Sequence, residues 1–130
     1  MIEISVAADS LVKLAGKVEK FTVTIGPALE ARDQEFAEKL LAQVNKNASG
    51  RPGPNVVTGK YRSMFMIVNG RVVNPSPQTR RLEYGFSGTD SEGRVFHQPP
   101  FPHIRPAMTV VSREFRESLP RFVISVWRKS

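Results

Sequence analysis

The feature that most constrains the fold is a proline-rich segment, Gln98-Pro99-Pro100-Phe101-Pro102-His103-Ile104-Arg105-Pro106-Ala107-Met108. Proline lacks a backbone N–H and holds φ near one value, so residues 99–102 are predicted to form a stiff, extended stretch. Pro106 suits the first turn of a helix, because its missing donor would have no partner there. Such a segment sets the direction in which a helix starts, and it supplies no nucleophile, base or set of metal ligands.

A long helix is predicted after this segment. Its apolar residues recur at helical spacing: Ile104, Met108, Val111, Phe115, Leu119, Phe122 and Val126. Pro120 is expected to kink or split this helix. Arg128 and Lys129 lie in the last turn, where cations favour the negative end of the helix dipole.

The first 47 residues are predicted to be largely helical. Residues 2–6 alternate weakly and predict a short strand. Asp9 or Ser10 can cap a helix with one apolar face, which holds Leu11, Leu14, Ala15 and Val18. Residues 21–25 are ambiguous, and Gly26-Pro27 predicts a break followed by a helix over about 27–47. The apolar stripe of that helix holds Leu29, Phe36, Leu40, Leu41 and Val44.

The middle of the chain shows strand and turn patterns. After a loop over 47–55, Asn69-Gly70 separates two apolar runs and predicts a β-hairpin, since both turn positions need positive φ. Residues 79–84 predict a short helix or strand, residues 86–94 an exposed loop, and residues 95–97 a brief strand. We therefore expect a single α+β domain over 1–130, with a long N-terminal helical segment and a C-terminal helix packed on a small antiparallel sheet.

The net charge of +7 is concentrated in the second part of the chain. Residues 48–130 hold 13 Lys or Arg against 5 Asp or Glu, and arginine dominates. Arginine pairs well with carboxylates and phosphates, so the fitting partners are an acidic protein surface or nucleic acid. The chain has no cysteine, no signal-peptide pattern, and no apolar run long enough to cross a bilayer. We therefore expect a soluble chain with no membrane partner.

The residue patterns predict no catalytic, cofactor or metal site. The stretch from Gly53 to Lys60 does not have the spacing of a phosphate-binding loop. His97 and His103 are the only histidines, and the sequence places no carboxylate near them. Glu83 follows Arg80 and Arg81, which predicts an ion pair on a helix surface. We therefore expect a protein that is not an enzyme.

Three blocks of the sequence are similar to one family when they are taken in order. They are Pro54-Asn55-Val56-Val57-Thr58-Gly59-Lys60-Tyr61-Arg62-Ser63, Arg80-Arg81-Leu82-Glu83-Tyr84-Gly85, and Pro99-Pro100-Phe101-Pro102-His103-Ile104-Arg105-Pro106-Ala107-Met108. They resemble blocks of the head–tail joining (neck, tail-completion or minor tail) proteins of long-tailed bacteriophages. The chain departs from that pattern by one inserted residue between Pro54 and Thr58, by Arg80-Arg81 in place of an aromatic-Ala pair, and by His103 where Phe is common.

The resemblance implies a structural virion protein of the neck, made in the cytoplasm of a host bacterium. It would join head to tail as part of a ring of its own copies, next to connector and tail proteins and in possible non-specific contact with packaged DNA. A tail terminator and a small basic nucleic-acid-binding protein are the alternatives. The candidate assembly residues are Arg105, Pro102, His103, Arg80, Arg81, Glu83, Tyr84 and Gly85. Arg105 is expected either to reach a carboxylate on the next copy or to pair within its own chain.

Overall fold

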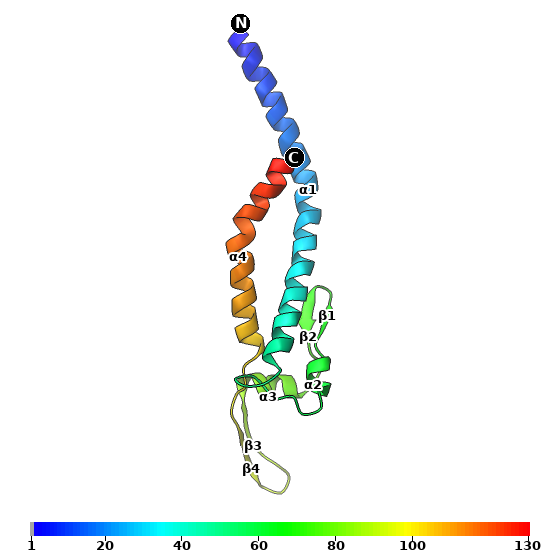
Figure 1. The fold of residues 1–130 in the computed structure, drawn as a ribbon, viewed down its shortest axis with the longest axis vertical. Helices are drawn as coiled ribbons and strands as arrows, with labels where there is room; N and C mark the ends of the chain where they lie inside the picture. Colours follow the sequence, from blue (N-terminus) through cyan, green and yellow to red (C-terminus); the bar gives the residue numbers. More distant parts are fainter. Residues whose placement is uncertain (1) are drawn as a thin grey trace. The chain divides into compact units, whose positions relative to one another are not determined.

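The structure is a computed structural model that describes residues 2–130, with side chains from residue 8 onward (Figure 1). Its elements are α1 (Ile2–Asn47), α2 (Lys60–Ser63), β1 (Met66–Val68), β2 (Arg71–Val73), α3 (Gln78–Tyr84), β3 (Phe86–Thr89), β4 (Val95–Gln98) and α4 (Ile104–Lys129). The predicted α+β class is confirmed. The strands form two separate antiparallel pairs, β1–β2 and β3–β4, where the sequence predicted one small sheet.

The chain packs as two compact units. One unit comprises Met1–Asp33 and Arg116–Ser130, and the other comprises Gln34–Phe115. Each contains part of α1 and part of α4. The expectation of a single domain over 1–130 stays a prediction.

Helix α1 corrects two predictions about the first half of the chain. Residues 2–6 are helical, so the predicted strand is wrong, and Pro27 lies inside α1, so the predicted break at Gly26-Pro27 is also wrong. An internal proline removes a helix hydrogen bond and costs about 3 kcal/mol. Contacts with α4 on both sides of Pro27 offset this cost: Phe21 packs edge-on against Trp127, and Arg32 lies over the ring of Phe122.

Helix α4 likewise continues through a proline. The helix begins at Ile104, as predicted, and runs to Lys129 with Pro120 inside it. The predicted split at Pro120 is therefore wrong. Arg32 of α1 holds the helix on either side of Pro120, because it donates a hydrogen bond to Ser118 and stacks on Phe122.

Only one of the two β-hairpins could be predicted from the sequence. The β1–β2 turn is at Asn69-Gly70, where φ is 51° and 75°, so this prediction is confirmed. The predicted loop over 86–94 is confirmed for residues 90–94 and wrong for residues 86–89, which form β3 and pair with β4. Gly88 obscured this strand, since glycine disfavours strands, but here it makes room for the ring of Phe86.

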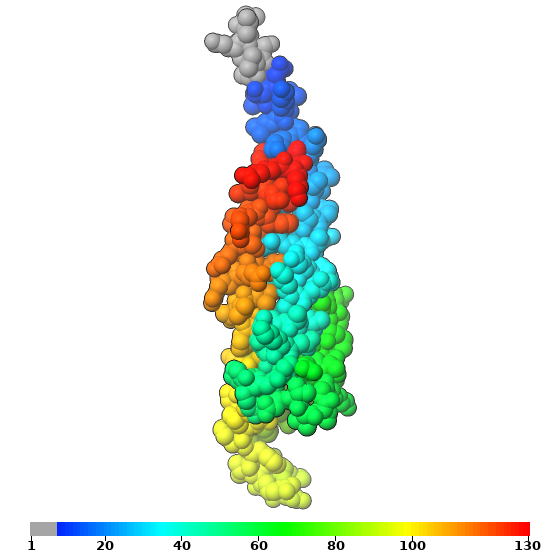
Figure 2. Space-filling model, in the orientation of Figure 1, coloured from blue at the N-terminus to red at the C-terminus, as the bar shows by residue number. Residues whose placement is uncertain are grey.

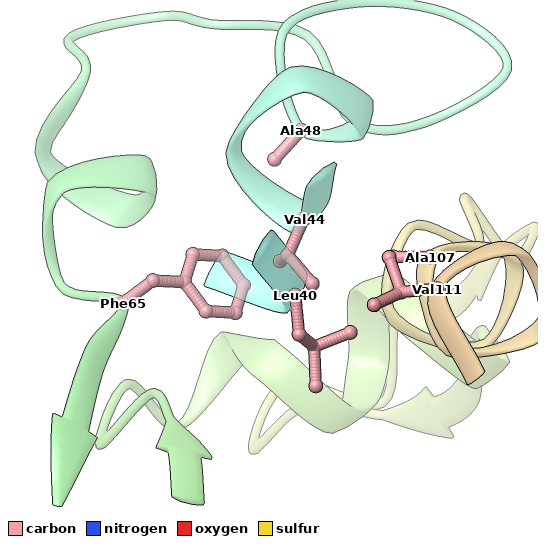
Figure 3. Packing of buried hydrophobic residues seen from close by; sticks show 6 residues of the cluster. All are labelled: Leu40, Val44, Ala48, Phe65, Ala107 and Val111. Carbon is pink, nitrogen blue, oxygen red and sulfur yellow. The ribbon is translucent and has the colours of Figure 1, made fainter. Parts of the chain in front are cut away.

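The core of the second unit is built from three segments (Figure 3). Helix α1 contributes Leu40, Val44 and Ala48, helix α4 contributes Ala107 and Val111, and Phe65 enters from the segment after α2. Phe36 and Phe115 are half-buried against this cluster and meet edge-on, with ring centroids 5.1 Å apart. Part of each predicted apolar stripe belongs to this core, Phe36, Leu40, Leu41 and Val44 from α1 and Ile104, Val111 and Phe115 from α4, which fixes the start of α4 beside the end of α1 within this unit. The stripe predictions are wrong for Leu29, Met108 and Leu119, which are exposed.

Candidate functional site: a buried carboxylate at the start of helix α4

The side chain of Glu83, in α3, ends at the first turn of α4. Glu83 is only 2% exposed. Its Oε2 accepts hydrogen bonds from the backbone N–H groups of His103 and Ile104 at 2.8 and 2.9 Å, and its Oε1 accepts one from Arg105 N–H at 2.8 Å. The carboxylate thus caps the N-terminus of a helix that lies 20 residues away in the sequence.

The sequence of the α4 start explains why it needs a cap from elsewhere. The first N–H groups of a helix have no partner inside it, and a Ser, Thr, Asp or Asn normally supplies one. Here the residues before the helix are Phe101, Pro102 and His103, which are not such cap residues. A negative charge at this end is also stabilised by the helix dipole. Glu83 therefore provides both the acceptor and the charge that the local sequence lacks.

His103 is fully buried and links the cap to α2. Its Nδ1 lies 2.9 Å from the carbonyl oxygen of Phe101 and 3.1 Å from Oε2 of Glu83, and its Nε2 lies 2.6 Å from the hydroxyl of Tyr61. Two acceptors at Nδ1 place the proton there, so Nε2 accepts a hydrogen bond from Tyr61. The expectation that no carboxylate lies near the histidines is therefore wrong for His103.

Arg105 and Tyr84 form the exposed side of the site. Nε of Arg105 donates to Oε1 of Glu83 at 3.2 Å, and its guanidinium lies 4.6 Å from the centre of the Tyr84 ring. Both residues are exposed. Of the two expectations for Arg105, the structure shows the pair within its own chain, while contact with a neighbouring copy stays a prediction.

Gly85 places the β3–β4 hairpin next to this site. Its φ is +82°, and a Cβ at this position would lie 2.8 Å from the carbonyl oxygen of Gln98. Only glycine fits both demands without strain. The hairpin base is further tied down because the Gln98 amide donates to the carbonyl of Arg81, and the Arg81 guanidinium stacks on Phe86. The hairpin projects from here (Figure 1).

The structure brings together most of the residues that the sequence singled out. Glu83, His103, Arg105 and Tyr84 are in direct contact, and Tyr61 joins them from the first block of similarity. The N–H of Phe101, beside Pro102, donates to the carbonyl of Leu82 at 2.6 Å, which fastens the proline-rich segment to α3. Arg80 is exposed on α3, and no contact places it in the site. The predicted surface ion pair of Glu83 with Arg80 or Arg81 is wrong, since Glu83 is buried and pairs with Arg105.

The ionisation of the site follows from these contacts. Burial alone raises the pKa of the Glu83 carboxyl, but the backbone N–H groups of His103, Ile104 and Arg105 and the Arg105 side chain together hold that pKa below its ordinary value. Burial raises the pKa of the Tyr61 phenol, a hydrogen bond with Thr79 opposes this, and the charge of Glu83 adds to it. Tyr61 therefore stays protonated and able to donate to His103.

The polar groups of this site hold parts of the same chain together. Both oxygens of Glu83 are taken up by donors of the same chain, and the His103 ring is enclosed. Among the side chains that the structure describes, no group of three potential ligands could hold a metal ion. Within residues 2–130, no helix is both long and apolar enough to span a membrane.

Comparisons with known proteins were negative. No family model, curated protein or solved structure matches this chain. The neck-protein resemblance therefore depends on the three sequence blocks alone.

Sequence reasoning missed the role of Glu83, although a signal was present. A helix start without a local cap residue needs an acceptor from another segment. Glu83 is the only acid in the three blocks of similarity. These two observations together point to Glu83 as the cap, whereas its neighbours Arg80 and Arg81 pointed to a surface ion pair.

Proposed function

We propose that this chain is a structural protein of a tailed bacteriophage, which joins the DNA-filled head to the tail as part of a ring. The observation that supports the proposal is that the three blocks similar to neck proteins meet at one place in the fold. Tyr61 comes from the first block, Glu83 and Tyr84 from the second, and His103 and Arg105 from the third. Residues that are far apart in the sequence thus form one rigid junction.

The surface beside the junction has properties suited to assembly. Val95 and Phe96 of β4 are exposed apolar side chains, and Glu92 in the hairpin turn is exposed. The β3–β4 pair has no third strand, so both outer edges have unpaired backbone groups within the part of the chain that the structure describes. A two-stranded hairpin is marginally stable alone, and exposed strand edges invite pairing. The hairpin is therefore our candidate contact with a neighbouring subunit.

The junction gives this hairpin a defined base. A ring needs heterologous contacts, in which one patch of each copy meets a different patch on the next. Such contacts repeat accurately only if the patches are held on a rigid support. The buried Glu83 and His103, the Phe101–Leu82 hydrogen bond and Gly85 provide that support on the side of α3 and α4. Arg105 and Tyr84 lie at the exposed side of this support, where the hydrogen bond to Glu83 and the contact with the Tyr84 ring hold the Arg105 side chain in place.

The test is to interrupt the gene in the phage genome that encodes this chain and to supply variants in trans. We expect the interrupted genome to yield DNA-filled heads and separate tails by electron microscopy, and the wild-type chain to restore joined particles. Normal yields of complete, infectious particles without the chain would contradict the proposal. Full heads with tails of irregular length would identify the tail terminator instead.

A matched pair of variants tests the hairpin itself. Val95→Glu changes an exposed residue of β4, and Val68→Glu changes an exposed residue of β1 in the other hairpin. We expect both proteins to fold, and only Val95→Glu to fail in restoring joined particles. If purified wild-type protein binds DNA with a steep dependence on salt while particles form normally without it, the nucleic-acid-binding alternative is favoured.

A further inference from the structure

A pocket beside α2 is a feature that neither the core nor the junction explains. It has a volume of about 720 Å³ and is open to solvent, and its walls come from the loop over 51–59, from α2, from α3 with the residues before it, and from Phe101. All of these segments belong to the second unit of the fold. A concave site of this size is a candidate for binding. We call it the α2 pocket.

The α2 pocket combines apolar walls with basic side chains. Val57, which is 91% exposed, and Phe101 are among its apolar side chains. Its charged side chains are Arg51, Lys60 and Arg62, and no acidic residue lines it within the part of the chain that the structure describes. Such a lining fits a segment that carries both apolar groups and negative charge.

The positive charge of the pocket is not neutralised by nearby acids in the sequence. Residues 39–82 hold eight Lys or Arg and no Asp or Glu. The Arg51 guanidinium lies 3.8 Å from the centre of the aromatic ring in the pocket, and Arg62 donates a hydrogen bond to Ser49 at 2.8 Å. The Lys60 side chain is exposed, and among the described residues no hydrogen bond or ion pair engages its ammonium group. The pocket therefore offers two fixed cations and one unpaired cation to an anionic partner.

The turn of the β3–β4 hairpin has the opposite charge. It holds two acids, Asp90 and Glu92, and one base, Arg94, which pairs with them at 2.6 and 3.2 Å, so one negative charge is in excess. Oδ1 of Asp90 also accepts hydrogen bonds from the backbone N–H groups of Glu92 and Arg94 at 2.9 and 2.8 Å. These bonds hold the turn in one shape and leave the Glu92 side chain 71% exposed.

The hairpin also exposes apolar side chains on both of its faces. Val95 and Phe96 follow each other in β4 and are 80% and 47% exposed, and successive side chains of a strand point to opposite faces. A ribbon of this kind suits insertion between two walls, because both of its faces have apolar surface to cover. The hairpin projects from the second unit (yellow-green in Figure 2), and none of its described residues lines the α2 pocket of its own chain.

We propose that the β3–β4 hairpin of one copy inserts into the α2 pocket of the next copy. In this contact the acidic turn faces Lys60 and its basic neighbours, and Val95 and Phe96 cover the apolar walls. The contact is heterologous, as a ring requires, because each copy contributes a hairpin to one neighbour and a pocket to the other. Nucleic acid fits this pocket less well, because the surfaces that bind it are more polar than these walls. The inference rests on the proposed function and names the surface that receives the hairpin.

The test reverses one charge on each side of the contact in the full chain. Glu92→Lys changes the turn, and Lys60→Glu changes the pocket. Glu38→Lys is the matched control, because Glu38 is an exposed glutamate of α1 that does not line the pocket. All three side chains are exposed, so the variants should fold, which circular dichroism checks.

Self-association is measured by analytical ultracentrifugation over a range of protein concentrations. We expect the wild-type chain to form oligomers, Glu92→Lys and Lys60→Glu each to associate at least about tenfold more weakly, and Glu38→Lys to change association less than about twofold. A monomeric wild-type chain, or a reversal at Glu92 or Lys60 that leaves association unchanged, would overturn the inference.

A mixture of the two variants tests whether the hairpin and the pocket meet each other. The Glu92→Lys chain keeps an intact pocket and the Lys60→Glu chain keeps an intact hairpin, so an equal mixture should associate at least about fivefold more tightly than either variant alone. A mixture that associates no more tightly than its parts would contradict the pairing of hairpin with pocket. Binding of a DNA duplex that Lys60→Glu abolishes, with self-association unchanged, would assign the pocket to nucleic acid instead.

The phage experiment separates this inference from the proposed function. If each reversal loses self-association but still restores joined particles, the hairpin contact is real and the ring proposal is wrong. If self-association is unaffected by both reversals and the interrupted genome still fails to join heads and tails, the pocket inference is wrong and the proposed function stands.

Discussion

Replacing the buried carboxylate of Glu83 is predicted to destabilise the fold strongly. Glu83→Gln keeps the size of the side chain but offers one acceptor oxygen, so its NH₂ group faces either the N–H of Arg105 or the N–H groups of His103 and Ile104. Loss of a cap costs about 0.5–2 kcal/mol, and a hydrogen bond to a charged group contributes about 1.5–3 kcal/mol. We therefore expect a loss of about 2–4 kcal/mol in the free energy of unfolding.

The loss should depend on pH in a direction that the pKa of Glu83 determines. The folded state holds the pKa of this carboxyl below the ordinary value of 4.5. Its ionised form therefore adds stability that is fully present above the unfolded pKa and is lost as the pH falls through the lower, folded pKa. The difference in stability between wild type and Glu83→Gln should be largest near pH 7 and should shrink below about pH 4.

The measurement is urea unfolding, followed by circular dichroism at several pH values. Glu114→Gln is the matched control, because Glu114 is an exposed glutamate paired with Lys39 at 3.1 Å, and such pairs contribute about 0–1 kcal/mol. In a chain of 130 residues, a loss of about 3 kcal/mol lowers the melting temperature by roughly 10 °C. A Glu83→Gln protein as stable at pH 7 as Glu114→Gln would refute the capping role.

Four further substitutions test other parts of the fold. Leu40→Ala should cost about 2–5 kcal/mol in the free energy of unfolding, and Phe115→Ala should also destabilise, because both pack in one core. Gly85→Ala should lower the melting temperature and increase proteolysis at the β3–β4 hairpin, whereas unchanged values would mean that the turn relaxes easily. Tyr61→Phe should cost about 1–3 kcal/mol, because it leaves the buried Nε2 of His103 without its donor, and a neutral result in urea unfolding would contradict that tautomer.

Several parts of this fold are determined by local sequence, that is, by residues close to one another in the chain. The Asn69-Gly70 turn, the end of α1 at Asn47 and the start of α4 after the proline-rich segment were all predictable. In each case the cause is local: positive φ at the turn, a Gly- and Pro-rich loop after the helix, and prolines before the next one. The α+β class follows from the change of apolar spacing between the segments.

The tertiary structure alone decided the rest, because the deciding contacts join segments far apart in the sequence. Pro27 and Pro120 look like helix breaks by local rules, but contacts between α1 and α4 within one unit offset the lost hydrogen bonds. Glu83 looked like a surface residue beside two arginines, and the fold instead buries it against three N–H donors about 20 residues further on. A buried carboxylate accepts hydrogen bonds from backbone N–H groups that have no other partner, such as those at the first turn of α4. Only the packing of α3 against the start of α4 brings Glu83 within hydrogen-bonding distance of them.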